Sequence, residues 1–154
     1  MAVSTCTPEE MQQVLDKLPQ KPPFLFLDKI IELSDNHIVA QRRFRADEDF
    51  YKGHFPGDPV TPGVILVEAM AQAGLVALGI YLLSKEQPDI KMRTLFSDCS
   101  VDFLEMVRPG SLVTIYGERI FWRRNKLKSK VELKLEDGAL AAHGTVSGLG
   151  VVLP

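Results

Sequence analysis

The C-terminal third of the chain has the clearest alternation of apolar and polar side chains. Between residues 126 and 136, uncharged and mostly aliphatic side chains alternate with charged ones. The uncharged set is Leu127, Ser129, Val131, Leu133 and Leu135, and the charged set is Lys126, Lys128, Lys130, Glu132, Lys134 and Glu136. A period of two predicts a strand with one buried and one solvated face. Apolar runs at 112–122 and 139–152, the second following the Asp137-Gly138 turn, extend this strand into an antiparallel meander.

The middle of the chain shows a different pattern, a long apolar run with few polar interruptions. In the stretch 64–83 the only strongly polar side chains are Glu68 and Gln72, whose spacing of four puts them on one face of a helix. Thr61 and Pro62 suit the N-cap and the first turn, so a helix is predicted from here to about the end of the run. The apolar run after Gln72 is too short to span a membrane, so we expect a buried central helix.

Capping and turn residues predict the remaining elements. Thr7 and Glu10 match a capping box, so a short helix is expected from Pro8 to about Leu18. The further predicted strands are residues 24–33, 37–46 and 93–104. This order predicts an α+β domain whose antiparallel sheet curls around one helix. The small side chains expected to pack closely against that sheet are Ala69, Ala73 and Ala77.

Composition narrows the class of protein. A length of 154 residues suits one domain over residues 1–154. The formal net charge of −2 does not indicate a nucleic-acid surface. The basic run 123–128 is expected to form a charged hairpin turn. Cys6 and Cys99 match no metal or redox spacing, and the N-terminus lacks a signal-peptide pattern, so we expect a cytoplasmic protein that is not embedded in a membrane. His37 and His143 have no companion at ligand spacing, so no metal site is expected.

The stretch before and within the central helix carries the candidate chemistry. His54 lies on a loop rich in Pro and Gly, which restrains the backbone around a titratable imidazole. Gly63 falls in the first helical turn, where unpaired N–H groups and the helix dipole can polarise a carbonyl oxygen, as an oxyanion site requires. Glu68 is a carboxylate on an apolar helix, where burial is costly unless the group is paired or neutralised. His54 and Glu68 are therefore a candidate acid–base pair.

Two simpler interpretations compete with this one. Glu68 and Gln72 could form a thin solvent-facing stripe on an amphipathic helix, which would require no chemical role. His54 lies beside a turn and could be an ordinary surface or turn-forming residue. Burial of the helix face that carries Glu68 and Gln72 would argue against the first of these alternatives.

Residues 54–72 read HFPGDPVTPGVILVEAMAQ, and this motif closely resembles the FabZ-type 3-hydroxyacyl-[acyl carrier protein] dehydratases of the hot-dog fold. Their pattern is His-Phe-Pro-Gly-x-Pro-(Val/Ile)-Met-Pro-Gly, followed by an apolar helix with Glu-Ala-(Met/Leu)-Ala-Gln; Thr61 is the visible exception. The resemblance extends to Leu18-Pro19, Pro23-Phe24-Leu25, Asp28, Phe103 and Pro109-Gly110. It implies a curled antiparallel sheet wrapped around one long central helix.

The resemblance also implies a reaction, the cofactor-free dehydration of 3-hydroxyacyl thioesters to trans-2-enoyl thioesters. His54 would remove the proton from the carbon α to the thioester carbonyl, and Glu68 would assist loss of the 3-hydroxyl as water. The N–H groups of Gly63 and Phe55 would stabilise the enolate-like oxygen, and Gln72 would orient Glu68. Resembling enzymes place His from one chain beside Glu from the other, which implies a homodimer or a trimer of dimers. Glu rather than Asp at position 68 favours a simple dehydratase over one that also isomerises the double bond.

Departures from the family pattern leave the carrier and the pathway open. Pro22 stands where the family commonly has Tyr, and residues 102–111 (DFLEMVRPGS) replace the family's basic Lys-Phe-Arg-x-Pro-Val-x-Pro-Gly-Asp segment. Less positive charge near the site leaves both acyl carrier protein and coenzyme A as carriers, and favours a specialised polyene or polyketide-like pathway over housekeeping fatty-acid synthesis. Two alternative functions remain, a non-catalytic acyl-binding regulator and a hot-dog thioesterase in which Glu68 activates water.

Overall fold

A computed structural model describes residues 6–154 and is built around one antiparallel sheet of six strands. The order across the sheet is β1-β2-β4-β5-β6-β3, so β1 and β3 form its two edges. The strands are β1 (Lys29–Leu33), β2 (His37–Arg43), β3 (Met92–Phe103), β4 (Leu112–Arg123), β5 (Lys126–Lys134) and β6 (Leu140–Val152). The consecutive antiparallel pairs β4–β5 and β5–β6 confirm the predicted meander. Residues 1–5 of the predicted domain lie outside the described residues.

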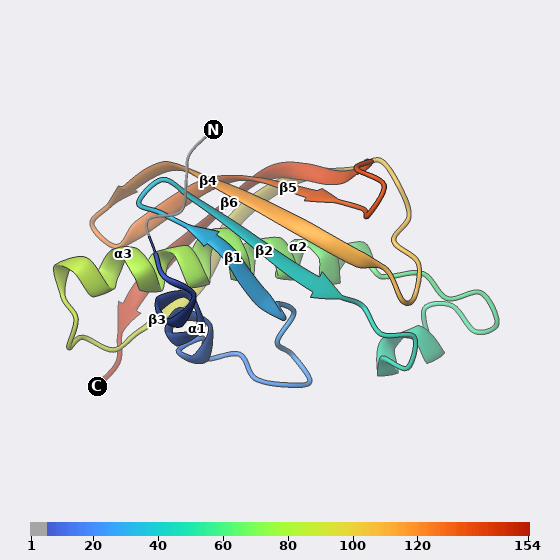
Figure 1. Ribbon diagram of the computed structural model, residues 1–154, viewed down its shortest axis with the longest axis horizontal. Coiled ribbons are helices and arrows are strands. Elements are labelled where there is room, and N and C mark those ends of the chain that lie inside the picture. The colour runs from blue at the N-terminus through green and yellow to red at the C-terminus, as the bar shows by residue number, and fades with distance from the viewer. Residues whose placement is uncertain (1–5) are drawn as a thin grey trace.

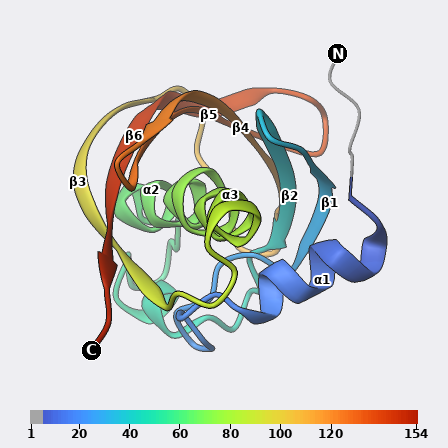
Figure 2. The ribbon, with the colours of Figure 1, turned by 90° about the vertical axis from the view of Figure 1, so that its left-hand side faces the viewer.

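The sheet curls around a central helix that runs from Gly63 to Glu86 (Figure 2). Its segments are α2 (Gly63–Ala71), a π-helical stretch η2 (Gln72–Ala77) and α3 (Leu78–Glu86). By length and composition alone this helix could cross a membrane, but 61% of an apolar 18-residue stretch within it is buried inside the protein. The buried apolar side chains form one core cluster between helix and sheet. The predicted α+β hot-dog architecture is confirmed.

A short outer helix, α1 (Pro8–Asp16), lies beside β1 (Figures 1 and 2). Its capping box is confirmed, since the Thr7 hydroxyl accepts from the Glu10 N–H at 3.2 Å and the Glu10 carboxylate accepts from the Thr7 N–H at 3.1 Å. The helix ends slightly before the predicted boundary at Leu18. Met11, Val14 and Leu15 form its buried face.

The first hairpin is confirmed, but both strands are shorter than the predicted ranges 24–33 and 37–46. Residues 24–27 stay outside β1, and the Phe26 N–H donates to the side chain of Gln72 at 2.8 Å instead of to a strand. After Arg43 the chain turns, and the Glu48 N–H donates to the Arg45 carbonyl at 3.2 Å. The Gln72 side chain of the central helix therefore takes the place of strand pairing in the segment before β1.

The predicted N-cap of the central helix is wrong by one residue. Pro62 occupies the N-cap position and makes no side-chain capping bond, and Gly63 is the first helical residue. Thr61 is buried, and its hydroxyl lies 2.6 Å from the hydroxyl of Tyr51 instead of capping a helical N–H. The Thr61 N–H donates to the Val107 carbonyl at 2.9 Å, so the hydroxyl and the N–H of this residue are both engaged away from the helix.

A pair of glycines, Gly74 and Gly117, lies where the central helix packs against the sheet. A Cβ added to Gly117 on β4 would lie 3.2 Å from the Cα of Gly74, and one added to Gly74 would lie 2.8 Å from Val131 on β5. The hydroxyl of Ser129 donates to the Gly74 carbonyl at 2.7 Å. This bond gives a hydrogen-bond donor to a backbone carbonyl within the π-helical stretch. The three alanines expected to permit close packing are fully buried, and Gly74 also packs against the sheet.

The basic run 123–128 forms the turn between β4 and β5, as predicted. Arg124 and Asn125 have φ of 50° and 62°, the left-handed values that a two-residue hairpin turn with matching twist requires. Local turn geometry therefore accounts for this charged segment.

Candidate active site

The imidazole of His54 is held by the loop that precedes the central helix. This loop follows the 3-10 helix η1 (Asp49–Lys52). The side chain is half-buried, and its Nδ1 lies 2.9 Å from the carbonyl oxygen of Val60, while the Val60 N–H donates to the His54 carbonyl at 2.9 Å. A carbonyl can only accept, so Nδ1 carries the hydrogen and the neutral ring presents a free lone pair on Nε2. The ring of Phe55 stacks on the imidazole at 4.1 Å between centroids. This arrangement leaves Nε2 as the basic atom.

Glu68 lies on α2 and is partly buried. Burial raises the pKa of its carboxyl group, and a hydrogen bond from Gln72 offsets part of this rise. The Gln72 amide donates to a carboxyl oxygen of Glu68 at 2.8 Å. A raised pKa favours the protonated acid, the form that can donate a proton to a leaving hydroxyl.

Gln72 is fully buried and joins the helix to the segment before β1. Its amide donates to the Phe24 carbonyl at 2.9 Å, and its oxygen accepts from the Phe26 N–H at 2.8 Å. With the bond to Glu68, both ends of the amide are engaged. The alternative of a solvent-facing Glu68–Gln72 stripe is therefore wrong, because Gln72 is fully buried against residues 24–26 and Glu68 is partly buried.

Gly63 begins the central helix, so its N–H has no carbonyl of a preceding turn to bond. The ring of Phe103 at the end of β3 covers its Cα, and an added Cβ would lie 3.1 Å from the ring. A glycine therefore fits under this ring where a larger side chain would not, and binding of a ligand carbonyl by its N–H stays a prediction. Phe55 follows His54 and has an exposed side chain, and an oxyanion role for its N–H stays a prediction.

The structure connects some of the predicted site residues and leaves others apart. Glu68 and Gln72 are directly hydrogen-bonded, whereas within residues 6–154 of one chain no hydrogen bond or ion pair joins His54 to Glu68. Sequence reasoning missed the Tyr51–Thr61 hydroxyl pair. The departure from the family pattern at Thr61 was the signal for it.

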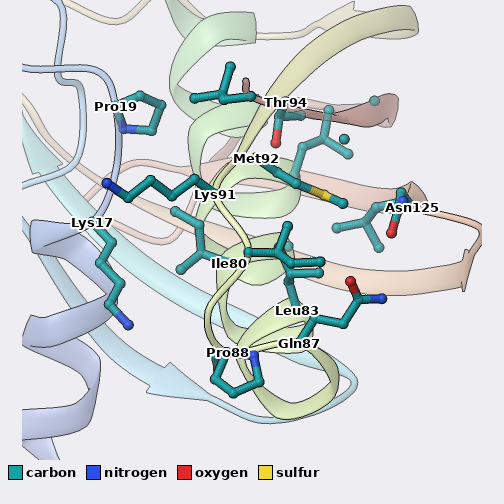
Figure 3. Close-up of a pocket in the computed structure, with 18 of the residues that line it drawn as sticks. Lys17, Pro19, Ile80, Leu83, Gln87, Pro88, Lys91, Met92, Thr94 and Asn125 are labelled. Carbon is teal, nitrogen blue, oxygen red and sulfur yellow. The ribbon is translucent and has the colours of Figure 1, made fainter.

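An apolar cavity of about 550 Å³ lies at the other end of the central helix (Figure 3). Ile80 and Leu83 line it from α3, Met92 and Thr94 from β3, and Pro88 from the loop between these elements. Figure 1 shows this end of the helix opposite the loop that follows η1. The cavity starts about two helical turns beyond Glu68, at Leu75.

Within residues 6–154 no group of three or more His, Cys, Asp or Glu side chains is placed to hold a metal ion. The polar groups that the site offers are the imidazole, the carboxyl group, the buried amide and the first N–H of the helix. These groups suit proton transfer next to a polarised carbonyl.

Comparison with known proteins agrees with this chemistry. The FabA-like domain family matches residues 18–143. A 3-hydroxyacyl-[acyl-carrier-protein] dehydratase FabZ from Streptococcus uberis is 37% identical over 139 residues, which cover 90% of this chain and 95% of that protein. The corresponding protein from Lactobacillus helveticus is 36% identical over 126 residues, 81% of this chain and 82% of the relative.

Solved structures share the architecture at lower identity. The dehydratase heterocomplex ApeI:P from Xenorhabdus doucetiae gives a TM-score of 0.74 at 20% identity, covering 89% of this chain and 90% of that one. A thioesterase from Haemophilus influenzae gives 0.66 at 19% identity, covering 99% and 96%. These likenesses support the fold alone.

The fold and the site define a hot-dog protein with a FabA-like domain. Within that class, the sequence identities place the chain in the family of FabZ-type 3-hydroxyacyl-[acyl-carrier-protein] dehydratases.

Proposed function

We propose that this protein dehydrates 3-hydroxyacyl thioesters to trans-2-enoyl thioesters in fatty-acid or related polyene or polyketide-like lipid synthesis. The observation that carries the proposal is the partly buried Glu68 carboxyl, whose pKa is raised by burial and whose oxygen is held by Gln72. A raised pKa favours the protonated form of the carboxyl group, which can supply the proton that turns a hydroxyl into a leaving water. The Nδ1-anchored imidazole of His54 offers the complementary base.

In the proposed reaction Nε2 of His54 takes the proton from C2, and the C2–H electron pair forms the new double bond as the C3–O bond breaks. Glu68 gives its proton to the departing 3-hydroxyl, which leaves as water. The thioester oxygen gains charge during proton removal, and the Gly63 N–H at the helix start would stabilise it. The products are the enoyl thioester, a Glu68 carboxylate and a protonated His54, which exchange protons with solvent before the next turnover.

The same proposal includes a homodimer with shared active sites. The edge strand β3 is exposed over most of its length, and its neighbourhood presents large apolar side chains: Leu95, Phe96, Phe103, Leu104 and Met106. Val64 at the start of the central helix is 76% exposed. A long apolar edge is a ready pairing surface, so a second copy aligned along β3 is expected to cover it. His54 of one chain would then meet Glu68 of the other.

The group that carries the acyl chain, acyl carrier protein or coenzyme A, depends on the charges around the site. Basic side chains near the His54 loop are paired with acids, Lys52 with Asp49 at 3.2 Å and Arg108 with Asp58 at 3.7 Å. These pairs reduce the positive field that would attract an acidic carrier protein. Both acyl-carrier-protein and coenzyme A substrates therefore belong in the assay, at several chain lengths. We expect a cytoplasmic location, which cell fractionation tests.

The reaction is tested by following enoyl thioester absorbance with purified protein, His54→Ala and Glu68→Gln. Each variant is expected to lose activity by about 10²-fold or more, since each removes one proton-transfer group. Unchanged activity in both variants would exclude this mechanism. Release of free thiol would indicate the thioesterase alternative, and acyl-thioester binding without turnover at every chain length would indicate the acyl-binding regulator.

Shared sites are tested by mixing the two inactive variants after dissociating each one. A mixed dimer carries one intact pair, His54 from the Glu68→Gln chain and Glu68 from the His54→Ala chain. About a quarter of the total sites would then be restored under random pairing, by the symmetry of a two-fold dimer. No recovery in demonstrated mixed dimers would place each site within one chain.

A further inference from the structure

Tyr51 and Thr61 form a buried hydroxyl pair at the base of the loop that carries His54. Their hydroxyl oxygens lie 2.6 Å apart, and the two side chains are 5% and 4% exposed. Tyr51 lies within η1, just before the loop, and Thr61 lies at the end of the loop, just before the N-cap Pro62 of the central helix. The hydrogen bond therefore closes residues 52–60 across their base.

Each side of this pair is held in place by other contacts. The ring of Tyr51 packs edge-on against Phe50, with ring centroids 4.7 Å apart, and its N–H donates to the Glu48 carbonyl at 3.1 Å. The Thr61 N–H donates to the carbonyl of Val107, which is itself buried. Burial raises the pKa of Tyr51, so its phenol stays neutral and able to donate at neutral pH. The pair is a fixed contact between two packed segments.

The pair lies one peptide unit from the group that orients the imidazole. The carbonyl of Val60, the residue before Thr61, faces His54 Nδ1 at 2.9 Å, and the Val60 N–H donates to the His54 carbonyl at 2.9 Å. A displacement of Thr61 would move the Val60 peptide and both of these bonds. Orientation of the ring, and the choice of which nitrogen carries the hydrogen, depend on that carbonyl.

Position 61 is also where this chain departs from the family motif, which has Met there. A methionine thioether is a weak acceptor and has no hydrogen to donate, so it cannot reproduce a bond between two hydroxyl groups. Threonine in this chain supplies a directional contact where the family pattern has a flexible apolar side chain.

We propose that Tyr51 and Thr61 are positioning residues for the dehydration, which lock the Val60 carbonyl against His54 and hold the imidazole with Nε2 free. The inference rests on the proposed function for its effect on turnover. Its effect on the imidazole itself is independent of any substrate.

Three substitutions separate positioning from folding. Thr61→Val and Tyr51→Phe each remove one hydroxyl with little change of shape, and Thr61→Ser keeps a hydroxyl. We expect kcat to fall roughly tenfold in Thr61→Val and Tyr51→Phe, because a loosened catalytic group loses its near-attack geometry. KM should change by less than about twofold, because the pair does not touch substrate. Thr61→Ser is expected to retain wild-type kcat.

The double variant Tyr51→Phe/Thr61→Val tests whether the two hydroxyls act as one unit. If they act only through each other, its kcat equals that of either single variant instead of falling by the product of the two losses. Multiplicative losses would show two independent effects and would contradict the pair as a unit.

The tautomer of His54 gives a readout that a purely structural role would not move. In ¹⁵N NMR spectra, with His54→Ala used to identify the resonances, the wild-type ring should show protonated Nδ1 and unprotonated Nε2. Thr61→Val and Tyr51→Phe should show a mixture of tautomers, and Thr61→Ser should restore the wild-type signals. Wild-type kcat and tautomer in both hydroxyl-deleting variants would overturn the proposal.

The two proposals can fail separately. If wild-type protein does not dehydrate any hydroxyacyl thioester, the proposed function fails, while the NMR comparison still decides whether the hydroxyl pair orients His54. If turnover is confirmed but the tautomer and kcat ignore both hydroxyls, only the positioning role is lost.

Discussion

The central helix has two faces that are built on different principles. One face carries Glu68 and Gln72, whose polar groups bond to each other and to the backbone of residues 24–26. The other presents Gly74 to the sheet, where missing side chains let Gly117 and Val131 approach. The first face depends on hydrogen-bond partners, and the second depends on shape.

This difference shows how one helix can serve both the core and the site. Close packing at Gly74 fixes where the helix lies against the sheet, because interiors tolerate few voids and few overlaps. The polar face can then hold a partly buried carboxyl at a defined place, although such a group is costly without partners. Substitutions on the two faces should therefore change different measurable quantities.

The largest expected effect is a loss of activity without a loss of stability. Glu68→Gln should lower kcat by about 10²-fold or more while the free energy of unfolding stays within about 0.5 kcal/mol or rises, because glutamine can still accept from Gln72. Parallel turnover and urea-unfolding measurements check this. Glu86→Gln on the same helix is the matched control and should leave both quantities unchanged. Strong destabilisation by Glu68→Gln would show that the carboxyl is mainly structural.

Gln72→Leu, on the polar face, should lower both the unfolding free energy and kcat. It removes the bond to Glu68 and leaves the Phe24 carbonyl and the Phe26 N–H without this partner, so we expect a loss of about 2–4 kcal/mol in unfolding free energy together with lower kcat. The exposed Gln12→Leu substitution on α1 is the control and should change stability by less than about 0.5 kcal/mol. An equally small effect at Gln72 would mean that its bonds contribute little.

Two glycines of the central helix should respond oppositely to alanine. At Gly74 the new Cβ would lie 2.8 Å from Val131, so Gly74→Ala should destabilise by about 1–3 kcal/mol through overpacking. At Gly79 the nearest atom, on Leu127, is 3.7 Å away, so Gly79→Ala should stabilise by about 0.5–1 kcal/mol through helix propensity. Thermal unfolding of the two variants tests this contrast, and equal shifts of the same sign would contradict it.

The smallest expected effect is a pH dependence of stability at Glu68. Because burial raises the pKa of this carboxyl in the folded state, the folded protein binds more protons than the unfolded chain between the ordinary value of 4.5 and the raised one. The contribution of Glu68 to stability is fully present below 4.5 and is lost as pH rises through the raised value. The stability of Glu68→Gln relative to wild type should therefore increase with pH over this range in urea titrations. A difference that is constant with pH would contradict the raised pKa.

Sequence reasoning reached most of the fold because the signals were local. The alternation at 126–136, the Thr7–Glu10 capping box and the Asp137-Gly138 turn each depend on neighbouring residues, and β5, α1 and the β5–β6 turn lie where these patterns indicated. The errors also have a physical cause. The strand start at Phe24 and the cap at Thr61 failed because long-range partners, Gln72 and Tyr51, took the polar groups that local rules had assigned elsewhere.

Residue types and spacing by themselves determined the helix-in-sheet architecture, the family and the residues able to perform acid–base chemistry, because periodicity and motif are properties of the chain. Only the tertiary structure decided that Gln72 is buried against residues 24–26, that Val60 anchors the imidazole, and that Thr61 pairs with Tyr51. These facts depend on which distant segments come within hydrogen-bond distance, and folding alone sets such distances.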